Sequence, residues 1–288
     1  IWPPILQGII LTKRPFASGA NYARIWDREE NASPLRVFTR RQAEKLSARL
    51  EKDGIPVAWG MRYGQPSVKD ALTSLMDQGC DRIISIPLYP QYAAATTATA
   101  NDQLFRALMR LRRQPAVLTM PSFPDHPLFI KALQTSVRET LESLPFKPQQ
   151  IVASFHGLPK TCIDKGDSYR DECVRTIVAL RQALDLREEQ MPLTFQSRFG
   201  PLEWIQPYTA PFVSALPAQG ITKIAVIMPG FMTDCIETLD EIGNELREEF
   251  MAAGGEEFAI VPCLNDSEGA IDLLEELSRS ALKGFQFS

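Results

Sequence analysis

His156 is one of only two histidines in the 288 residues of this chain, and it ends an apolar run in the segment IVASFHGLPK (151–160). The run is typical of a buried strand, which Gly157 and Pro159 break directly after the histidine. Imidazole changes its charge between about pH 5 and pH 8, so a histidine at a strand end is suited to accept protons or bind a metal. A hydrogen-bonded structural histidine is the alternative. The other histidine, His126, lies between turn residues and is typical of a helix start.

Carboxylates recur along one predicted helix, in the segment DCIETLDEIGNEL (234–246). Glu237, Glu241 and Glu245 follow one another at intervals of four residues, so one face of the helix is acidic. Such oxygen ligands beside an imidazole would attract a divalent metal or relay protons. Two alternatives stay open: a solvated helix face, and an N-terminal cap in which Asp234 and Glu237 are reciprocal partners.

The elements that position these residues follow from the apolar pattern. Short apolar runs alternate with segments of helical periodicity, and the runs are continuous, which indicates strands covered on both faces. We therefore predict an α/β, doubly wound fold. The expected strands are 55–63, 82–90, 116–124, 151–159, 192–200, 223–231 and 258–265. The expected helices include 67–78, 126–143, 168–186 and 235–252.

A segment rich in Pro and Gln, LPFKPQQ (144–150), separates two similar halves of this pattern, and we place a domain boundary there. Ligands of parallel sheets bind outside the carboxyl ends of the strands. The residues that follow predicted strands are therefore candidates for a site: Arg62, Tyr63, Tyr89, Tyr92, His156, Gln196 to Arg198, Asp234 and Glu237.

Composition excludes several classes of function. The net charge is −4 and the cations are scattered, which argues against a nucleic-acid partner. Five cysteines without a C-x-x-C pair predict neither a zinc knuckle nor an iron–sulfur site, and the odd number favours a reducing compartment. No dinucleotide, Walker or G-x-S-x-G motif is present, and no apolar run reaches the roughly 18 residues of a membrane span.

The first residues, IWPPILQGIILTKRPF, are apolar and then basic. A short apolar segment flanked by cations is suited to a membrane surface or the mouth of an apolar pocket, with a core helix as the alternative. Because the chain opens on Ile1 in the middle of a pattern, we expect its natural start to be missing.

Five segments together resemble the ferrochelatase family, whose members insert ferrous iron into protoporphyrin IX. They are GMRYGQPS, PLYPQYAAATTATA, SFHGLPKTCIDKGDSY, TFQSRFGPLEWIQPYT and PGFMTDCIETLDEI. The resemblance covers about residues 1 to 283. It implies two similar Rossmann-like, chelatase-type halves, 1–146 and 147–266, with a porphyrin cleft between them. It also implies that 267–288 forms a C-terminal helix that packs back on the first half.

The resemblance also implies roles for individual residues. His156 and Glu237 match the family's catalytic and metal-binding pair. Asp234, Glu241 and Glu245 fall along a proton or metal route. The positions matching porphyrin-binding residues are Arg62, Tyr63, Tyr92, Trp204, Trp2 and Ile5.

Partners and cofactors are expected from the same resemblance. Protoporphyrin IX and ferrous iron are substrates, no tightly bound cofactor is expected, and no [2Fe–2S] cluster is predicted because the C-terminal cysteines that bind it in some members are absent. Residues 1–12 would make a peripheral membrane contact, in a cytoplasmic protein or one bound to the inner membrane. Cys235 stands where many relatives have histidine, and the strand and NLGTP-like turn that open the family are missing.

Two other functions stay open. One is a cobalt or nickel chelatase that acts on a sirohydrochlorin-type ring, whose many carboxylates would call for a strongly basic pocket. The other is a non-catalytic porphyrin- or haem-binding protein.

Overall fold

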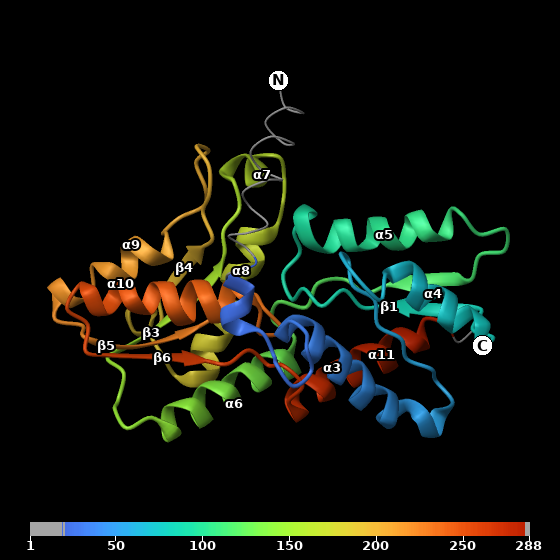
Figure 1. Ribbon diagram of the computed structural model, residues 1–288, viewed down its shortest axis with the longest axis horizontal. Helices are drawn as coiled ribbons and strands as arrows, with labels where there is room; N and C mark the ends of the chain where they lie inside the picture. The colour runs from blue at the N-terminus through green and yellow to red at the C-terminus, as the bar shows by residue number, and fades with distance from the viewer. Residues whose placement is uncertain (1–18, 20, 286–288) are drawn as a thin grey trace.

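The computed structural model describes residues 19 and 21–285, which form two parallel sheets at opposite ends of the long axis (Figure 1). The first sheet pairs β1 (Arg82–Ser85) with β2 (Ala116–Thr119). The second has the order β4-β3-β5-β6. Its strands are β3 (Gln150–His156), β4 (Leu193–Gln196), β5 (Lys223–Ile227) and β6 (Glu257–Val261). The predicted α/β fold with parallel sheets is confirmed.

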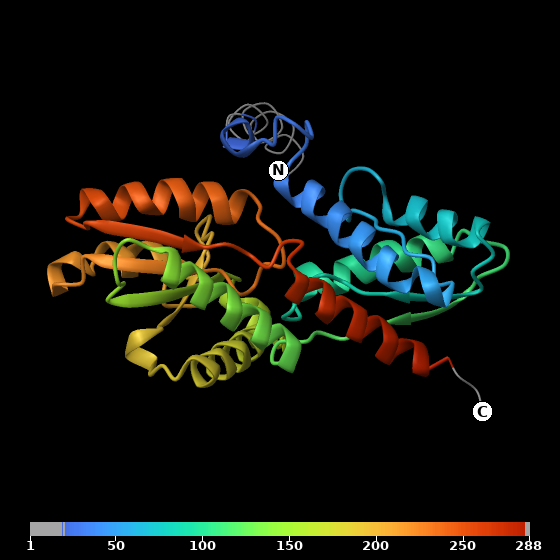
Figure 2. The same ribbon diagram turned by 90° about the horizontal axis from the view of Figure 1, so that it is seen from below.

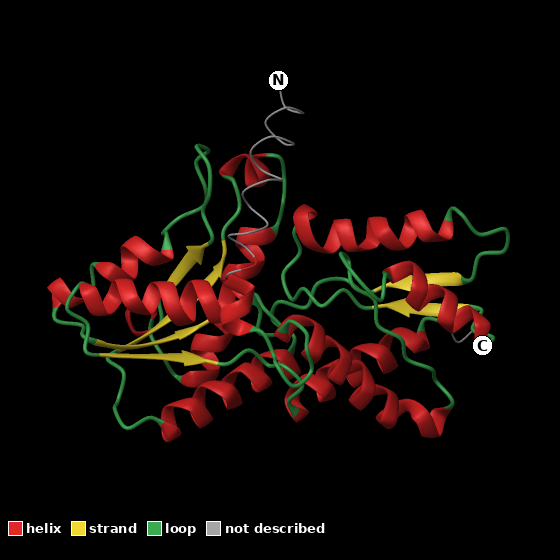
Figure 3. Cartoon of the chain, in the orientation of Figure 1, coloured by secondary structure: helices red, strands yellow, loops and turns green. Residues whose placement is uncertain are grey.

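The second sheet is covered by helices on both faces (Figure 3). Ile151, Ala153 and Phe155 of β3 belong to a core cluster shared with α6 (Pro127–Ser143) and α8 (Tyr169–Leu184). Val152 belongs to the cluster of the opposite face. That face is covered by α9 (Thr209–Ser214), the π-helix η6 (Glu237–Leu246) and α10 (Arg247–Ala252). Since both faces of β3 are buried, its interior is mostly apolar, and even its polar Ser154 is buried.

The first half is built from helices around the small sheet. These are α3 (Pro34–Leu50), α4 (Val68–Asp77), the π-turn η3 (Ala94–Ala98) and α5 (Thr99–Leu108). The C-terminal helix α11 (Glu268–Lys283) lies between α3 and α6, where Ile271 and Leu274 pack against Leu46 and Leu50 (Figure 2). Shorter elements are η2 (Glu51–Asp53), α7 (Lys160–Asp164), η4 (Glu188–Gln190) and η5 (Pro217–Gln219).

The prediction of a strand at 55–63 is wrong. Ile55 and Val57 pack against the apolar cluster of α3 and α11, but the backbone of this segment makes only one bridge in the described part of the chain, between Met61 and Ser67. An apolar run indicates that a segment is buried, whereas a strand also needs a neighbouring strand to which its backbone can hydrogen-bond. The other predicted strands exist but end earlier, so residues such as Ser197 and Arg198 lie in loops.

Within the described residues, no helix combines the length and apolar character needed to cross a membrane. The segment predicted to contact a membrane, residues 1–12 with Trp2 and Ile5, lies outside the described residues.

Candidate active site

His156 is the last residue of β3 and pairs in register with Gln196 at the end of β4. Its Nδ1 lies 2.6 Å from the carbonyl oxygen of Gly157. Because a carbonyl only accepts hydrogen bonds, Nδ1 carries the proton and Nε2 of the neutral ring carries the lone pair. The rings of Trp204 and Phe231 lie 6.4 and 6.5 Å from the imidazole, centroid to centroid. The site therefore presents a proton acceptor in an aromatic surrounding at the carboxyl edge of the sheet.

Gly157 brings the two strand ends together. Its N–H donates to the carbonyl of Gln196 at 2.8 Å. A Cβ on this residue would lie 2.8 Å from that same oxygen and 3.0 Å from Cε3 of Trp204. The break after His156 thus serves close packing, and it places the buried Trp204 beside the imidazole.

The predicted acidic stripe lies on the π-helix η6 rather than on an α-helix. The wider turn of a π-helix, frequent at functional sites, brings side chains four positions apart closer to one line. The stripe lines a cavity of 210 Å³. The lining residues are Asn21, Ile236, Glu237, Asp240, Glu241 and Glu245. Periodicity predicted the helix and its acidic face but not its π geometry.

Two predicted route residues have their carboxylates occupied by donors. Asp234 is buried and accepts from the Thr238 hydroxyl at 3.0 Å and from the Asn265 amide at 2.6 Å. The carboxylate of Glu241 accepts from the backbone and the hydroxyl of Ser197. Asp234 does not cap η6, whose N-cap residue is Ile236, so the reciprocal cap with Glu237 is not formed.

A cation that the sequence did not reveal lies at the acidic cavity. Arg24 pairs with the buried carboxylate of Asp240 at 3.1 Å and reaches Glu245 at 3.6 Å. Burial, followed by repulsion from Asp240, raises the pKa of Glu245 above the ordinary value. Tyr22 lies near the same helix, and burial followed by the charge of Glu237 raises the pKa of its phenol. Neither Tyr22 nor Arg24 belongs to a motif that could have indicated its place at this cavity.

Cys235, where many relatives have histidine, is buried. Burial raises the pKa of its thiol well above the usual range, and the negative charge of Glu237 raises it further. Without a bound metal, the side chain therefore stays a neutral thiol at physiological pH.

Of the predicted porphyrin-binding residues of the first half, Arg62 and Tyr63 lie in the loop before α4 and Tyr92 lies in the loop after β1. The guanidinium of Arg62 donates to the carbonyl of Ala95 at 2.6 Å and stacks 4.5 Å from the ring centroid of Tyr63. Tyr63 is 71% exposed. Nε of Arg62 is buried without a hydrogen-bond partner in the described part of the molecule.

Hydrogen bonds from α8 and the turn before it hold the loop after β1. The Tyr92 N–H donates to the buried carboxylate of Glu172 at 2.8 Å. Similar bonds join Gln91 to Thr176 and Ala94 to Asp167, each at 2.8 Å. The second half thereby positions the loop after β1 in the first half, and sequence periodicity gave no sign of these pairs.

Among the described residues, no group of three or more His, Cys, Asp or Glu side chains is arranged to hold a metal ion. Of the predicted pair, His156 lies at the end of β3 and Glu237 opens η6. Both adjoin Gln196, whose amide donates to the carbonyl of Glu237 at 2.8 Å.

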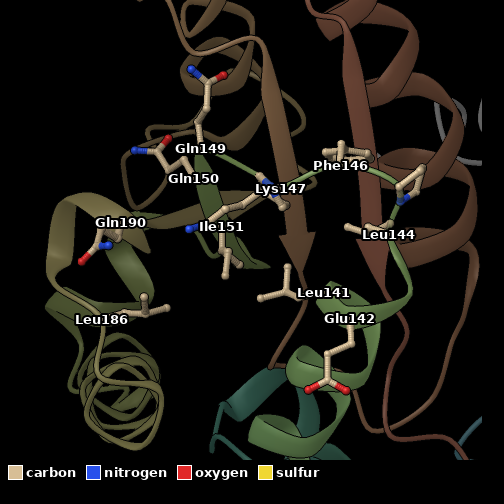
Figure 4. Close-up of a pocket in the computed structure, with 12 residues that line it drawn as sticks. Leu141, Glu142, Leu144, Phe146, Lys147, Gln149, Gln150, Ile151, Leu186 and Gln190 are labelled. Atoms are coloured by element: carbon tan, nitrogen blue, oxygen red, sulfur yellow. The ribbon is translucent and has the colours of Figure 1, made fainter.

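A larger cavity of 590 Å³ lies elsewhere, at the amino end of β3 (Figure 4). Leu141, Leu144, Phe146 and Ile151 give it apolar walls, and the predicted boundary segment 144–150 lines much of it. Because ligands of parallel sheets bind at the opposite, carboxyl ends, His156 and η6 remain the candidate active site.

The fold defines a chelatase-type α/β protein. SirB from Bacillus subtilis with Fe³⁺ superimposes with a TM-score of 0.63 at 13% identity, covering 89% of this chain and 95% of that one. DR2241 from Deinococcus radiodurans, described as similar to chelatases, superimposes with a TM-score of 0.51 at 13% identity, covering 83% and 50%. At these identities the likeness shows the fold alone.

Sequence comparison defines the family. The model of the ferrochelatase family matches residues 1–282. A ferrochelatase of Gluconobacter oxydans (strain 621H) is 84% identical over 99% of this chain and 83% of its own length. A ferrochelatase of Brucella anthropi is 52% identical over 99% and 82%. The chain belongs to the ferrochelatase family.

Proposed function

We propose that this chain inserts ferrous iron into protoporphyrin IX, with His156 as the proton acceptor and Glu237 beside it. The observation that carries the proposal is the imidazole at the carboxyl edge of the second sheet, with its Nε2 lone pair unused by the bond from Nδ1 to Gly157. The 84% identity to a ferrochelatase supports it. The reaction is that of a lyase: the two pyrrole N–H groups release their protons, two in total, and the four nitrogens bind Fe²⁺.

Iron enters here as a substrate rather than a resident cofactor, and no [2Fe–2S] cluster is expected. A neutral imidazole suits the removal of a pyrrole proton because a general base works best when its pKa lies near the operating pH. His156 takes the protons one at a time and must pass the first on before it accepts the second. The incoming ion sheds water while this happens, and a transient bond to His156 or Glu237 would replace part of that shell.

Glu237 and Glu245 form the inner and outer ends of a proton or metal route along the acidic cavity. The cavity contains both carboxylates, and the side chain of Glu245 is 51% exposed, so it meets solvent. The four carboxylates that line this cavity of 210 Å³ would attract a divalent cation and could pass protons to solvent. The place of Asp234 in this route stays a prediction, whereas the carboxylate of Glu241 already accepts two hydrogen bonds from Ser197.

The porphyrin would lie between Arg62, Tyr63 and Tyr92 of the first half and Trp204 of the second. A site that binds a bent macrocycle better than a flat one exposes nitrogen lone pairs and lowers the barrier through differential binding. Trp204 is buried beside His156, so it would support this fit mainly by fixing the position of the imidazole.

The rival chelatase reaction, on a sirohydrochlorin-type ring, is disfavoured by charge. Such a ring carries many carboxylates, and the carboxylates that line the acidic cavity would repel them. The similarity to relatives named ferrochelatase also supports the less charged porphyrin as the substrate of this chain. A binding protein without catalysis would have no use for the proton acceptor and acidic route.

Cytoplasmic location and peripheral membrane contact through residues 1–12 complete the proposal. The apolar-then-basic composition of this segment supports a membrane-surface role.

A substrate competition tests the proposal. We would offer the purified chain protoporphyrin IX and sirohydrochlorin separately under anaerobic conditions, each with Fe²⁺ and with Co²⁺, and follow absorbance. We expect metallation of protoporphyrin IX and not of sirohydrochlorin. We expect Co²⁺ as well as Fe²⁺ to enter the porphyrin, because an N/O site does not favour Fe²⁺ on affinity alone. Metallation of sirohydrochlorin in preference would support the rival chelatase, and porphyrin binding without any metallation would support the binding protein.

A further inference from the structure

The carboxylate of Glu241 is fastened to the loop that follows β4. The backbone N–H of Ser197 donates to Oε1 at 2.6 Å, and the Ser197 hydroxyl donates to Oε2 at 2.6 Å. The amide of Gln196 adds a third bond to Oε2 at 3.3 Å. Charge-assisted bonds of this kind are about twice as strong as neutral ones, so η6 is firmly attached to the end of β4.

Ser197 adopts an unusual backbone conformation to make these bonds. Its φ is 63°, in the left-handed region that residues with a Cβ rarely occupy. That conformation turns both donors of one residue toward the same carboxylate. Such strain persists where the surroundings fix it, and it concentrates at functional sites.

Gln196 connects this attachment to His156 and Glu237. Its amide N–H also donates to the backbone carbonyl of Glu237 at 2.8 Å, and its Oε1 accepts from the buried Ser154 hydroxyl at 2.8 Å. Gln196 is itself the register partner of His156. The first turn of η6 is therefore held against the strand ends at the height of His156.

We propose that Ser197 and Glu241 form a clasp that positions Glu237 relative to His156, so that Glu241 acts as a positioning residue and not as a step of the proton or metal route. This inference rests on the proposed function. Because the clasp attaches η6 to the end of β4, the distance between the His156 imidazole and Glu237 depends on the sheet edge as well as on η6. Displacement of a reacting group by about 1 Å can cost on the order of 100-fold in rate.

A double-mutant cycle on the full chain tests the clasp, with Ser197→Ala, Glu241→Gln and the double variant. Ser197→Ala removes the hydroxyl donor, and Glu241→Gln turns one acceptor into a donor that faces Ser197. We expect each single change to lower kcat for Fe²⁺ insertion about 10-fold or more with porphyrin KM within about twofold. The double variant should be no slower than the worse single variant, because both changes disrupt one unit.

Two control variants distinguish loss of the clasp from loss of any serine hydroxyl and from a change in backbone strain. Ser143→Ala removes an exposed hydroxyl that also makes one hydrogen bond, at the end of α6, and should leave kcat and KM unchanged. Ser197→Gly relieves the backbone strain but lacks the hydroxyl, so it should recover thermal stability relative to Ser197→Ala without recovering kcat.

Two outcomes would overturn the clasp. If Ser197→Ala keeps wild-type kcat while Glu241→Gln abolishes it, Glu241 is a route residue. If the variants lose thermal stability but keep kcat below their melting temperature, the contact is merely structural. If the wild-type chain fails to insert iron, the proposed function fails and the positioning role fails with it, whereas coupling in thermal stability still shows whether Ser197 and Glu241 act as one unit.

Discussion

Replacing Gly157 by alanine should damage both stability and catalysis. The added Cβ would lie 2.8 Å from the carbonyl oxygen of Gln196 and 3.0 Å from the Trp204 ring. Carbon contacts are optimal at about 3.5–4.0 Å, so the end of β3 or its neighbours must move by roughly 0.7 Å. Overpacking of this kind costs about 1–3 kcal/mol. The same shift stretches the Gly157 to Gln196 hydrogen bond, which adds about 1 kcal/mol.

The expected loss for Gly157→Ala is therefore about 2–4 kcal/mol in the free energy of unfolding. Because the moved strand end carries His156, we also expect kcat to fall about 10- to 100-fold. Urea unfolding gives the first number and anaerobic Fe²⁺ insertion the second. The matched control is Gly243→Ala, whose Cβ would meet Thr238 and Ile260 at ordinary distances of 3.5 and 3.6 Å.

Gly243→Ala should stay within about 1 kcal/mol of the wild type, because alanine suits a helix at least as well as glycine. If Gly157→Ala is as stable and active as this control, the close approach of β3, β4 and Trp204 does not constrain the site, and the role assigned to Gly157 is wrong.

Three further predictions concern the cavity and the contact between the halves. The pKa of Glu245 is raised in the folded state, so ionisation of this side chain opposes folding. Its contribution to the free energy of unfolding is full below the ordinary glutamate pKa and is lost as pH rises through the raised pKa. Glu245→Gln should therefore gain stability relative to the wild type between pH 4 and pH 7, by no more than about 0.5 kcal/mol because the side chain is half exposed; an unchanged difference in urea midpoints across this range would contradict it. Arg24→Ala leaves the buried Asp240 without its ion pair and should cost about 1–2 kcal/mol in urea unfolding, and no loss would mean that solvent replaces the arginine. Glu172→Ala removes the acceptor of the Tyr92 N–H and should raise porphyrin KM about fivefold with little change in kcat, whereas an unchanged KM would show that the loop is held without it.

Local patterns predicted the elements better than their pairings. Continuous apolar runs gave the parallel sheets because both faces of strands such as β3 are buried, and turn residues after His156 marked the strand end. The same reasoning wrongly made a strand of 55–63, since periodicity reports burial and not hydrogen bonding. The acidic spacing predicted the helix but not its π geometry.

Contacts between distant segments could not be predicted. The bond between Ser197 and Glu241 joins residues 44 positions apart, and the bond between Tyr92 and Glu172 joins residues 80 apart. Nothing in the local composition around Arg24 indicates its pairing with Asp240, 216 positions away. Such pairs depend on which elements the fold brings together, so residues such as Ser197 and Glu241 were found as candidates while the hydrogen bonds that join them were missed.

The role of His156 as acceptor of the pyrrole protons is the centre of the proposed mechanism. Anaerobic Fe²⁺ insertion into protoporphyrin IX, followed by absorbance for the wild type beside His156→Ala, tests it most directly. We expect steady formation of haem by the wild type and almost none by the variant, with porphyrin binding retained in both. Near-normal turnover by His156→Ala would contradict the assignment of His156 as the proton acceptor.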